Sequence, residues 1–265
     1  MTDELTDDFE TIRLEEPAEH LAALVLDRPD AMNSINDRML DELGEAVDQL
    51  EAADEIRAIM LRGAGEDAFS AGADVQSSGA MDHREGTEHS RRGQQVFGRF
   101  RETDMPVVAA IDGHCLGGGL ELSMCADLRV ASASSKFGLP EHDLGLLPGW
   151  GGTQRLQRLI GESAAKQVVF TAERFPAERM KEFGYLYAVY DENFDEQATE
   201  FAADIAGGPP IAQRYTKRAM REGFENIDAG LEVESQAFGH LLDTDDLAAG
   251  ITAFVTDDDP DFEGQ

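Results

Sequence analysis

Short apolar runs that end in glycine alternate with amphipathic stretches through the first half of the chain. The segments IRAIMLRG and MPVVAAIDG are compact and rich in β-branched residues, so each predicts a buried strand. Between such runs the apolar residues follow helical spacing, most clearly in a helix that Asn36 can cap. The apolar positions of this helix are Met39, Leu40, Leu43, Val47 and Leu50. Strands that alternate with helices predict an α/β body in which the buried strands are largely parallel.

The two ends of the chain carry different patterns. Near the N-terminus FETIRLEEPAEHLAALVLDRP predicts two strands around a turn at Glu16–Glu19, where Pro17 interrupts the pattern. From about Ile211 to Val255 we expect three amphipathic helices, with breaks near Gly223–Asp228 and Asp243–Asp246. We expect the last helix to bury one apolar face, formed by Leu247, Ile251, Phe254 and Val255. A terminal group of this kind needs a surface to cover, either the chain's own core or a neighbouring subunit.

Acidic residues dominate the composition and change what the surface is expected to bind. The 265-residue chain has 54 Asp and Glu against 22 Lys and Arg, which gives a formal net charge of -32. The acids recur within the predicted helices rather than in one tail, so the charge belongs to a folded surface. Such a surface repels phosphate backbones and anionic membranes, so we expect neither nucleic acid nor a membrane as a partner. A highly soluble protein is one explanation of this imbalance, but we favour adaptation to a salt-rich cytoplasm, as in a halophile.

The cysteines and the N-terminal residues bear on the compartment. Cys115 and Cys125 lie in one apolar segment without a CxxC pair, which indicates buried free thiols in a reducing compartment. The first residues, MTDELTDDFE, are acidic and lack the apolar run of a signal peptide, and no stretch approaches the length of a membrane span. We therefore expect a cytoplasmic protein.

Three consecutive glycines, Gly117–Gly119, stand directly before an apolar stretch that contains a single carboxylate, Glu121. The known glycine-rich phosphate loops do not fit this segment. A Rossmann fingerprint starting at Gly117 would need a third glycine where Leu122 stands, and the Gly-Lys pair of a P-loop is absent from the chain. The nucleophile elbow of serine hydrolases and the HExxH motif of zinc hydrolases are absent as well.

What the glycines offer instead is free backbone N–H groups. A strand that runs through this turn into a helix beginning near Gly118 presents N–H groups, which together with the helix dipole favour a negative oxygen. A second glycine-rich turn, FSAGAD, can present the N–H of Ala73. Two such groups pointing at one place would form an oxyanion hole. Each turn taken alone is equally consistent with tight packing between a strand and a helix.

A second carboxylate sharpens the choice. Glu141 follows a proline in FGLPEHDLG, downstream of Glu121. A Glu in an apolar sequence is often a half-exposed residue, whereas a buried one has to be paired, protonated or functional. If the two carboxyl groups face each other, they can share a proton.

Four motifs resemble the enoyl-CoA hydratase/isomerase (crotonase) superfamily, in the same order and near the usual spacing. They are AFSAGADV, HCLGGGLELSMCADLRVAS, FGLPEHDLGLLPGWGGTQRL and GGPPIAQRYTKRAM. The match covers nearly the whole chain, from LDRPDAMNSIN to the last helices. It implies an α/β, crotonase-like (ClpP/crotonase) spiral of ββα units that carries the active site in residues 1–205. Residues 206–265 would form a C-terminal helical trimerisation region, and the chain a homotrimer or a homohexamer built from two trimers.

The resemblance also implies residue roles. The N–H groups of Ala73 and Gly118 would polarise the thioester carbonyl of an acyl-CoA substrate and form the oxyanion hole. Glu121 would take a proton from the water that attacks C3, and Glu141 would give one to C2. The N–H of Gly149 would help to hold that water. No metal or other cofactor is implied, because coenzyme A is part of the substrate.

Recognition of coenzyme A is where the chain departs from the family. Hydratases of this family often carry a lysine where Asp30 stands, and a basic tail where this chain has TDDDPDF. Here we expect Arg28, backbone N–H groups near Ala73–Gln76 or salt-screened contacts to meet the phosphates instead. Trp150 either lines the acyl pocket or packs in the core. The complete set of expected substrate-binding residues is Arg28, Ala31, Asp74, Val75, Gln76, Gly149 and Trp150.

The function that these residues indicate is reversible syn addition of water to a trans-2-enoyl-CoA, giving a 3-hydroxyacyl-CoA. The alternatives within the family are a Δ3,Δ2-enoyl-CoA isomerase and another crotonase-family acyl-CoA lyase. The isomerase uses the same oxyanion hole but typically one carboxylate, so the presence of both Glu121 and Glu141 favours the hydratase. Some relatives bind RNA or serve as scaffolds, and the acidic surface argues against that alternative.

Overall fold

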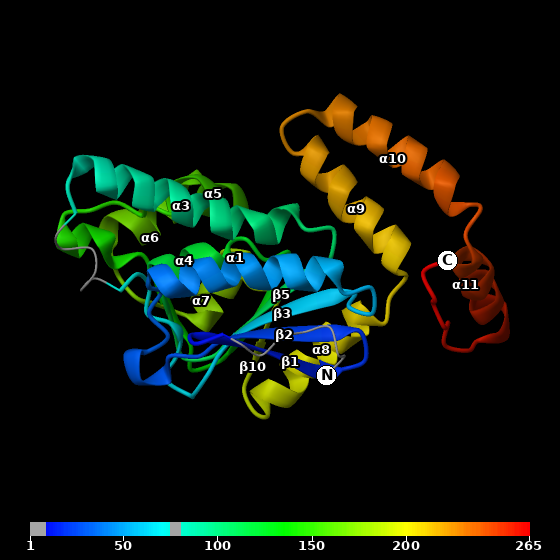
Figure 1. The fold of residues 1–265 in the computed structure, drawn as a ribbon, viewed down its shortest axis with the longest axis horizontal. Coiled ribbons are helices and arrows are strands. Elements are labelled where there is room, and N and C mark those ends of the chain that lie inside the picture. Colours follow the sequence, from blue (N-terminus) through cyan, green and yellow to red (C-terminus); the bar gives the residue numbers. More distant parts are fainter. Residues whose placement is uncertain (1–8, 75–80) are drawn as a thin grey trace.

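Two β-sheets form the centre of the molecule, and the computed structural model describes residues 9–74 and 81–265 of it (Figure 1). The larger sheet has six strands in the order β1-β2-β3-β5-β7-β10, of which only β1 and β2 pair antiparallel. Its strands are β1 (Ile12–Ala18), β2 (Leu21–Leu26), β3 (Ala58–Gly63), β5 (Val107–Ile111), β7 (Leu128–Ser132) and β10 (Ala188–Tyr190).

The smaller sheet lies in the order β4-β6-β8-β9, and only β9 runs antiparallel to its neighbour. Its strands are β4 (Ala68–Ser70), β6 (His114–Leu116), β8 (Lys136–Gly138) and β9 (Phe175–Pro176). Three times in succession the chain passes from a strand of the large sheet to one of the small sheet, from β3 to β4, β5 to β6 and β7 to β8. This repeated step is the spiral of ββα units, so the predicted fold class is confirmed.

Helices cover both sheets and continue beyond them. They are α1 (Asp37–Ala52), α3 (His83–Glu102), α4 (Gly118–Ser123), α5 (Gly152–Ile160), α6 (Glu162–Thr171), α7 (Ala177–Glu182), α8 (Phe194–Ala206), α9 (Pro210–Gly223), α10 (Ile227–Leu241) and α11 (Asp245–Thr256). The described residues also form two 3-10 turns, η1 (Pro29–Ala31) and η2 (Pro140–Leu144). The Asn36 side chain caps α1 by accepting a hydrogen bond from Met39 N, as predicted, and the expected apolar face of α1 is buried.

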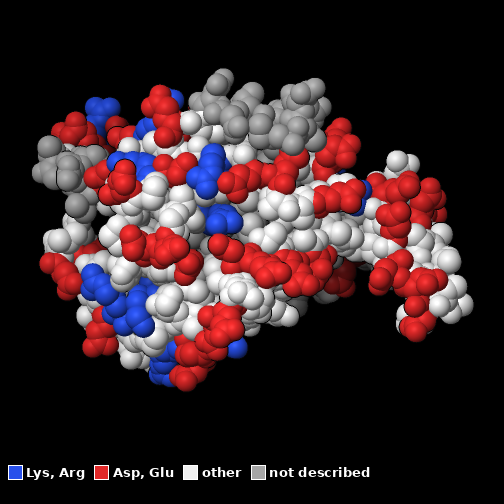
Figure 2. All heavy atoms as spheres, turned by 90° about the horizontal axis from the view of Figure 1, so that it is seen from below, with Lys and Arg blue, Asp and Glu red and all other residues white. Residues whose placement is uncertain are grey.

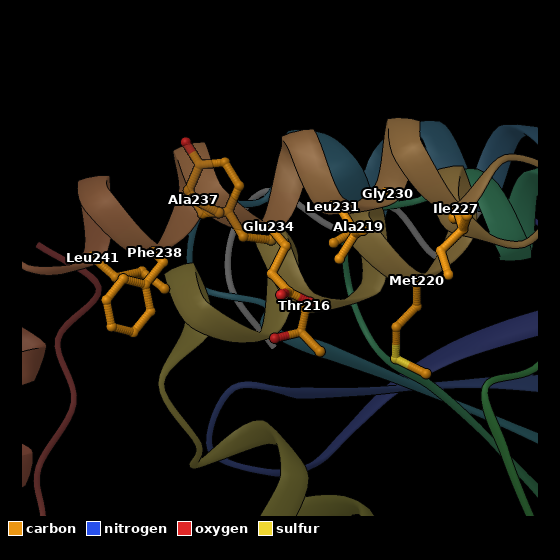
Figure 3. Close-up of a pocket in the computed structure, with 12 residues that line it drawn as sticks. Thr216, Ala219, Met220, Ile227, Gly230, Leu231, Glu234, Ala237, Phe238 and Leu241 are labelled. Atoms are coloured by element: carbon orange, nitrogen blue, oxygen red, sulfur yellow. The ribbon is translucent and has the colours of Figure 1, made fainter.

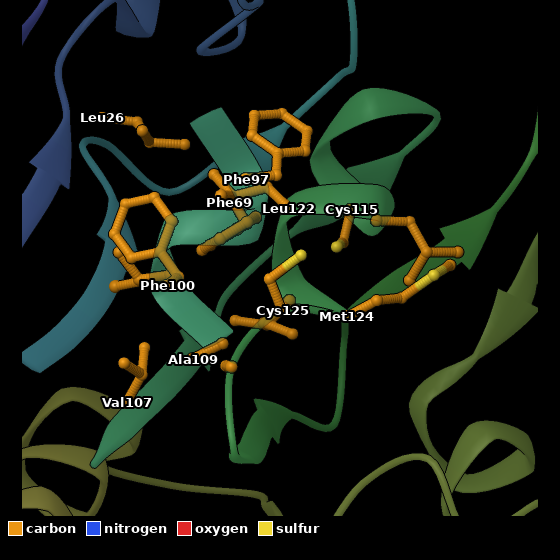
Figure 4. Close-up of a cluster of buried hydrophobic side chains, with 14 of the residues drawn as sticks. Leu26, Phe69, Phe97, Phe100, Val107, Ala109, Cys115, Leu122, Met124 and Cys125 are labelled. Carbon is orange, nitrogen blue, oxygen red and sulfur yellow. The ribbon is translucent and has the colours of Figure 1, made fainter. Parts of the chain in front are cut away.

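The main core lies where α3 and α4 meet the strands. Figure 4 shows Phe97 and Phe100 of α3 grouped with Phe69 of β4 and with Cys115 and Cys125. Both thiols are free and buried, as predicted. Burial raises the pKa of Cys115 to about 12 and that of Cys125 to about 11, so neither provides a reactive thiolate near neutral pH.

The predicted N-terminal turn is displaced. β1 continues through Pro17 to Ala18, and the turn falls at residues 19–20 instead of at Glu16–Glu19. The pairing with β2 shifts register between Glu15 and Ala18. Because β1 is an edge strand and Pro17 lies within this irregular stretch, the missing N–H of proline costs no ladder hydrogen bond.

Helices α9 to α11 extend away from the body (Figure 1), with breaks where the sequence predicts them. The prediction that α11 buries its apolar face is wrong for the single chain. Phe254 is 90% exposed, and the residues of α11 that are buried are Asp246 and Ala253. Leu247, Ile251 and Phe254 border a groove of about 440 Å³ whose other side is formed by residues of α9 and α10, and they stay exposed across it. The spacing therefore indicated amphipathicity correctly but not burial. The division at residues 205 and 206, and the role of the second part in trimerisation, stay predictions.

One buried cation fastens the projecting helices to the body. Lys217 Nζ of α9 lies 2.7 Å from Asp127 Oδ2, and it donates hydrogen bonds to the carbonyls of Phe100 and Met105. Asp127 also accepts from Val107 N at the start of β5. The same carboxylate therefore holds both α9 and the central strand.

Carboxylates are spread over the face seen in Figure 2, on the body and on the projecting helices alike, whereas Lys and Arg gather in fewer places. The acidic charge is thus a property of the folded surface, as predicted. Within residues 9–74 and 81–265, no helix is long and apolar enough to cross a membrane.

Candidate active site

Two glycine-rich turns meet at the start of α4. Gly72, which follows β4, has a φ of +104°, and a side-chain carbon on it would lie 3.1 Å from Gly118 N. A side-chain carbon on Gly118 would lie 3.3 Å from Ala73 N. The fold therefore brings together the two N–H groups that the sequence singled out. In the described part of the chain, the hydrogen bonds that tie these turns use neither the N–H of Ala73 nor that of Gly118.

Glu121 lies one turn into α4 and is 2% exposed. Its Oε1 accepts two backbone hydrogen bonds, from Trp150 N at 2.8 Å and from Gly152 N at 2.7 Å. A side-chain carbon on Gly152 would stand 3.0 Å from this oxygen, so glycine permits the close approach. Glu121 is therefore a buried carboxyl group that the backbone orients, and the alternative of a half-exposed surface residue is excluded.

Glu141 approaches the same place from η2. A side-chain carbon on Gly117 would lie 3.2 Å from Glu141 Oε1, so this carboxyl group lies over the turn that leads into α4. Its Oε2 is buried and has no hydrogen-bond partner within the described residues. One carboxyl group is thus held by two N–H groups, while the other has an oxygen free for a ligand.

The two carboxyl groups titrate close to neutrality. Burial raises the pKa of Glu121 to about 7; the N–H of Gly152 opposes the shift and the nearby charge of Glu141 adds to it. Burial also raises the pKa of Glu141, to about 6. Groups with such pKa values can hold and release protons at physiological pH without a large energetic cost. The site can therefore carry out paired acid and base chemistry beside an anion-stabilising backbone turn.

A family model described as enoyl-CoA hydratase/isomerase matches residues 16–265. This chain belongs to the enoyl-CoA hydratase/isomerase family. It is 38% identical to a short-chain-enoyl-CoA hydratase of Clostridium acetobutylicum, over 89% of this chain and 91% of that protein. It is also 38% identical to a crotonyl-CoA hydratase of Syntrophomonas wolfei, over 93% of this chain and 95% of that one. The crystal structure of an enoyl-CoA hydratase from Bacillus anthracis matches with a TM-score of 0.92 at 35% identity, covering 97% of this chain and all of that one.

Trp150, which the family resemblance left between two roles, packs in the core and is 3% exposed. Its indole makes an edge contact with Phe97 at 5.3 Å between ring centroids. Side-chain carbons on Gly93 or Gly118 would collide with the indole ring, so both glycines make room for it. The Trp150 side chain thereby fixes the distance between α3 and the start of α4, while the backbone N–H of Trp150 donates to Glu121.

The residues expected to bind coenzyme A are only partly brought together. Arg28 donates to Asp74 Oδ2 from both terminal nitrogens at 3.2 Å, and to the Ser34 carbonyl at 2.6 Å. Its guanidinium is therefore already neutralised by a carboxylate of the turn that carries Ala73. Ala31 ends η1 nearby in sequence, whereas Val75 and Gln76 lie outside the described residues. Their part in binding coenzyme A, and that of Gly149 in holding water, stay predictions.

Three side chains at this site were missed by the sequence reasoning. Ser90 and Gln94 of α3 donate to the carbonyl of Gly149, and Arg155 of α5 donates to the carbonyl of Trp150. Ser90 and Gln94 are one helical turn apart, which places them on one face of α3. Only the tertiary fold reveals that this face meets residues 149–152.

No group of three or more His, Cys, Asp or Glu side chains suited to a metal ion occurs within residues 9–74 and 81–265. The expectation that the reaction needs no metal or other cofactor stays a prediction.

Proposed function

We propose that this chain is an enoyl-CoA hydratase, a hydro-lyase that adds water reversibly and syn across the double bond of a trans-2-enoyl-CoA. Membership of the family and the hydratases among its relatives support this reaction. The observation that carries the proposal is the pairing of a buried carboxyl group, Glu121, with a partly buried one, Glu141. Glu121 is held by two backbone N–H groups, and Glu141, above the turn at Gly117, has an oxygen without a hydrogen-bond partner among residues 9–74 and 81–265.

The first step of the proposed mechanism is polarisation of the thioester. The N–H groups of Ala73 and Gly118 would donate to the carbonyl oxygen and stabilise the enolate that forms when water adds. Each donor of this kind contributes about 3 kcal/mol to transition-state stabilisation. Withdrawal of electrons toward this oxygen makes C3 of the enoyl group electrophilic.

The two carboxyl groups then act as base and acid. The oxygen of water bonds to C3 while Glu121 accepts one of its protons, and Glu141 delivers a proton to C2, so the C2–C3 double bond becomes a single bond. One carboxyl group gains a proton and the other loses one, and exchange between them or with solvent restores the starting state. The hydroxyl group at C3 and the proton at C2 are added to the same face of the double bond, which gives syn addition.

This assignment of roles requires the reactive proton to lie on Glu141, although Glu121 has the higher pKa of the two in this structure. Substrate binding would change that order. Glu141 is only partly buried, so an acyl-CoA that covers it would desolvate it further and raise its pKa. Glu121 is already buried, and a bound water that donates to it would favour its ionised form.

The test is an assay of the purified chain in molar KCl with crotonyl-CoA. Loss of the ultraviolet absorbance of the conjugated enoyl thioester, with formation of 3-hydroxybutyryl-CoA, is the expected result. A 3-enoyl-CoA is offered in parallel, because isomerisation without hydration would favour the isomerase. Absence of any turnover on enoyl-CoA esters of several chain lengths would overturn the proposal and favour a scaffold.

We further propose that the chain assembles as a homotrimer or as a hexamer of two trimers, in a salt-rich cytoplasm. An apolar surface on α9 and α10 supports the assembly. A hollow of about 310 Å³ lies between these helices. Figure 3 shows Met220, Ile227, Leu231 and Phe238 around it. All four side chains are exposed in the single chain, and Phe238 is 66% exposed. The net charge of -32 supports the proposed salt-rich environment.

A further inference from the structure

The segment 149–152 holds Glu121 by its backbone alone, which raises the question of what holds the segment. We infer that Ser90 and Gln94 of α3 are positioning residues for Glu121, acting through the peptide that joins Gly149 to Trp150. This inference rests on the proposed hydratase function, in which Glu121 is the base that activates water.

The first step is the contact between α3 and the segment. Ser90 Oγ donates to the carbonyl oxygen of Gly149 at 2.6 Å, and Gln94 Nε2 donates to the same oxygen at 2.9 Å. Gln94 Nε2 also lies 3.1 Å from Ser90 Oγ, so the two side chains support each other. Two donors thus converge on one carbonyl group.

The peptide unit that joins Gly149 to Trp150 is rigid. The carbonyl of Gly149 and the N–H of Trp150 belong to one planar trans peptide, so they point in opposite directions. Fixing the carbonyl toward α3 therefore fixes the N–H toward Glu121, whose Oε1 it meets at 2.8 Å. The side chains of Ser90 and Gln94 set the direction of a hydrogen bond that they do not themselves make.

The Gly149 carbonyl differs from the next two carbonyls in the helix that supplies its hydrogen-bond donors. The Trp150 carbonyl accepts from Arg155 Nη1 at 2.7 Å, and the Gly151 carbonyl accepts from the N–H groups of Gln154 and Arg155. Those donors belong to α5, which continues directly from the segment and moves with it. Ser90 and Gln94 belong to a different helix, so they fix the segment relative to the rest of the body.

The consequence for catalysis follows from the ionic form of Glu121. A well-aligned N–H stabilises the carboxylate, so loss of alignment raises the pKa of Glu121. The ionisable groups that face Glu121 are Glu141 of η2, Arg155 of α5 and the Cys125 thiol after α4, and none of these is altered by changes at Ser90 or Gln94. A net hydrogen-bond contribution of ordinary size corresponds to a pKa rise of about half a unit to one unit.

The experiment compares Ser90→Ala, Gln94→Ala and the double variant with Gln95→Ala. Gln95 is the next residue on α3 and is exposed, so this control makes the same truncation away from Gly149. For the double variant we expect kcat to fall about tenfold at neutral pH with little change in KM, and the acid limb of kcat/KM to move to higher pH. Ser90→Thr, which keeps the hydroxyl group, should restore most of the loss in Ser90→Ala. Gln95→Ala should stay within about twofold of the parent.

A second readout does not depend on turnover. Trp150 is the only tryptophan in the chain, and its backbone N–H contacts Glu121, so its fluorescence can report the protonation of that carboxyl group. His89 also lies 5.2 Å from the indole ring, and Glu121→Gln separates its contribution because any transition that remains then belongs to another group. We expect the Glu121 transition to shift to higher pH in the double variant and to be unchanged in Gln95→Ala.

The outcomes separate the two hypotheses. If the parent protein does not hydrate any enoyl-CoA, the proposed function fails, and the fluorescence titration still tests the positioning role. If the parent hydrates crotonyl-CoA but the double variant titrates and turns over like Gln95→Ala, the positioning role is overturned. A loss of kcat without a shift of the pH limb would also overturn it, because a merely structural defect would produce that result.

Discussion

Apolar side chains are buried in the segment that carries Glu121 but exposed on the helices at the C-terminal end. Around α4 every neighbour of Glu121 in the sequence is buried, and the carboxyl group is enclosed with them. In α9 to α11 the large apolar side chains point outward, as Phe254 and Phe238 illustrate. Both regions are amphipathic or apolar by sequence, yet only the first buries its large apolar side chains within the single chain.

The difference teaches that the two regions complete different structures. In the body, the turns, the core and the two carboxyl groups are all positioned by contacts inside one chain. An exposed apolar face of the size seen on α9 to α11 is typical of an interaction surface, because a monomer rarely leaves such a surface in water. Chemistry and assembly should therefore respond to separate sets of substitutions.

The largest effect is expected from the carboxyl groups themselves. Glu121→Gln and Glu141→Gln should each lower kcat for hydration by at least about 10²-fold, because each removes a proton acceptor or donor from the transition state. Steady-state kinetics with crotonyl-CoA measures this loss. Light scattering should show an unchanged assembly, since both residues lie in the body.

Isomerisation provides the control for the two roles. A 3-enoyl-CoA needs no added water, so its isomerisation should suffer less from Glu121→Gln than from Glu141→Gln. Hydration at nearly the parent rate by Glu121→Gln would contradict the proposed base and move the isomerase ahead.

The second effect is expected in the projecting helices. Phe238→Asp places a charge on the exposed apolar face, and loss of a central aromatic contact typically weakens an interface by about 2 kcal/mol or more. We expect smaller species by light scattering at dilute protein, with a smaller loss of kcat than either carboxyl variant shows. Gln236→Asp introduces the same charge two residues earlier on α10 and should leave the assembly intact. Equal behaviour of both variants, or a monomeric parent, would contradict the proposed interface.

How far the sequence predicts each region follows the same division. The helix capped by Asn36, the strands β1, β2, β3 and β5 and the position of Glu121 at the start of α4 were predictable, because each depends on residues close together in the chain. The hydrogen bond from Ser90 to the Gly149 carbonyl joins residues 59 positions apart, and it could not be predicted. The spacing of residues shows which face of α3 Ser90 occupies, but not which segment packs against that face. The prediction that α11 buries its apolar face failed for a related reason, because amphipathicity does not identify the surface that covers a helix.

The third effect concerns salt and acts on both regions. Charges repel over a Debye length of about 30 Å at 0.01 M ionic strength but only about 3 Å at 1 M. With a net charge of -32, the melting temperature, the activity and the assembled fraction should therefore rise with KCl into the molar range. Calorimetry and kinetics across a KCl series measure this, and a flat or falling profile would leave the acidic surface without this explanation.

The smallest effect is expected in the pH dependence of stability, where two buried carboxyl groups of the body can be compared. Glu121 and Glu42 are each 2% exposed, but their pKa values move in opposite directions. Burial raises the pKa of Glu121 to about 7, whereas for Glu42 the hydrogen bonds from Thr11, the Glu10 backbone and Arg38 outweigh burial and lower the pKa.

The sign of each contribution to stability follows from these directions. A carboxyl group with a raised pKa binds its proton more tightly in the folded state, so its contribution is present at low pH and is lost as pH rises through about 7. At pH 8 the folded state must therefore enclose a charge at Glu121, and Glu121→Gln removes that cost. We expect Glu121→Gln to stabilise the protein by about 1 to 3 kcal/mol at pH 8 and by much less near pH 5.

Glu42→Gln should do the reverse. Its lowered pKa contributes stability above the ordinary range of a carboxyl group, and this is lost as pH falls, so the variant should be destabilised at pH 8 and less so in acid. Thermal unfolding of both variants and the parent at pH 5 and pH 8 measures the two differences. If Glu121→Gln were less stable than the parent at pH 8, the carboxylate would be stabilised by its two N–H partners more than burial costs it. The raised pKa, and with it the proton transfer near neutrality that the proposed mechanism needs, would then be wrong.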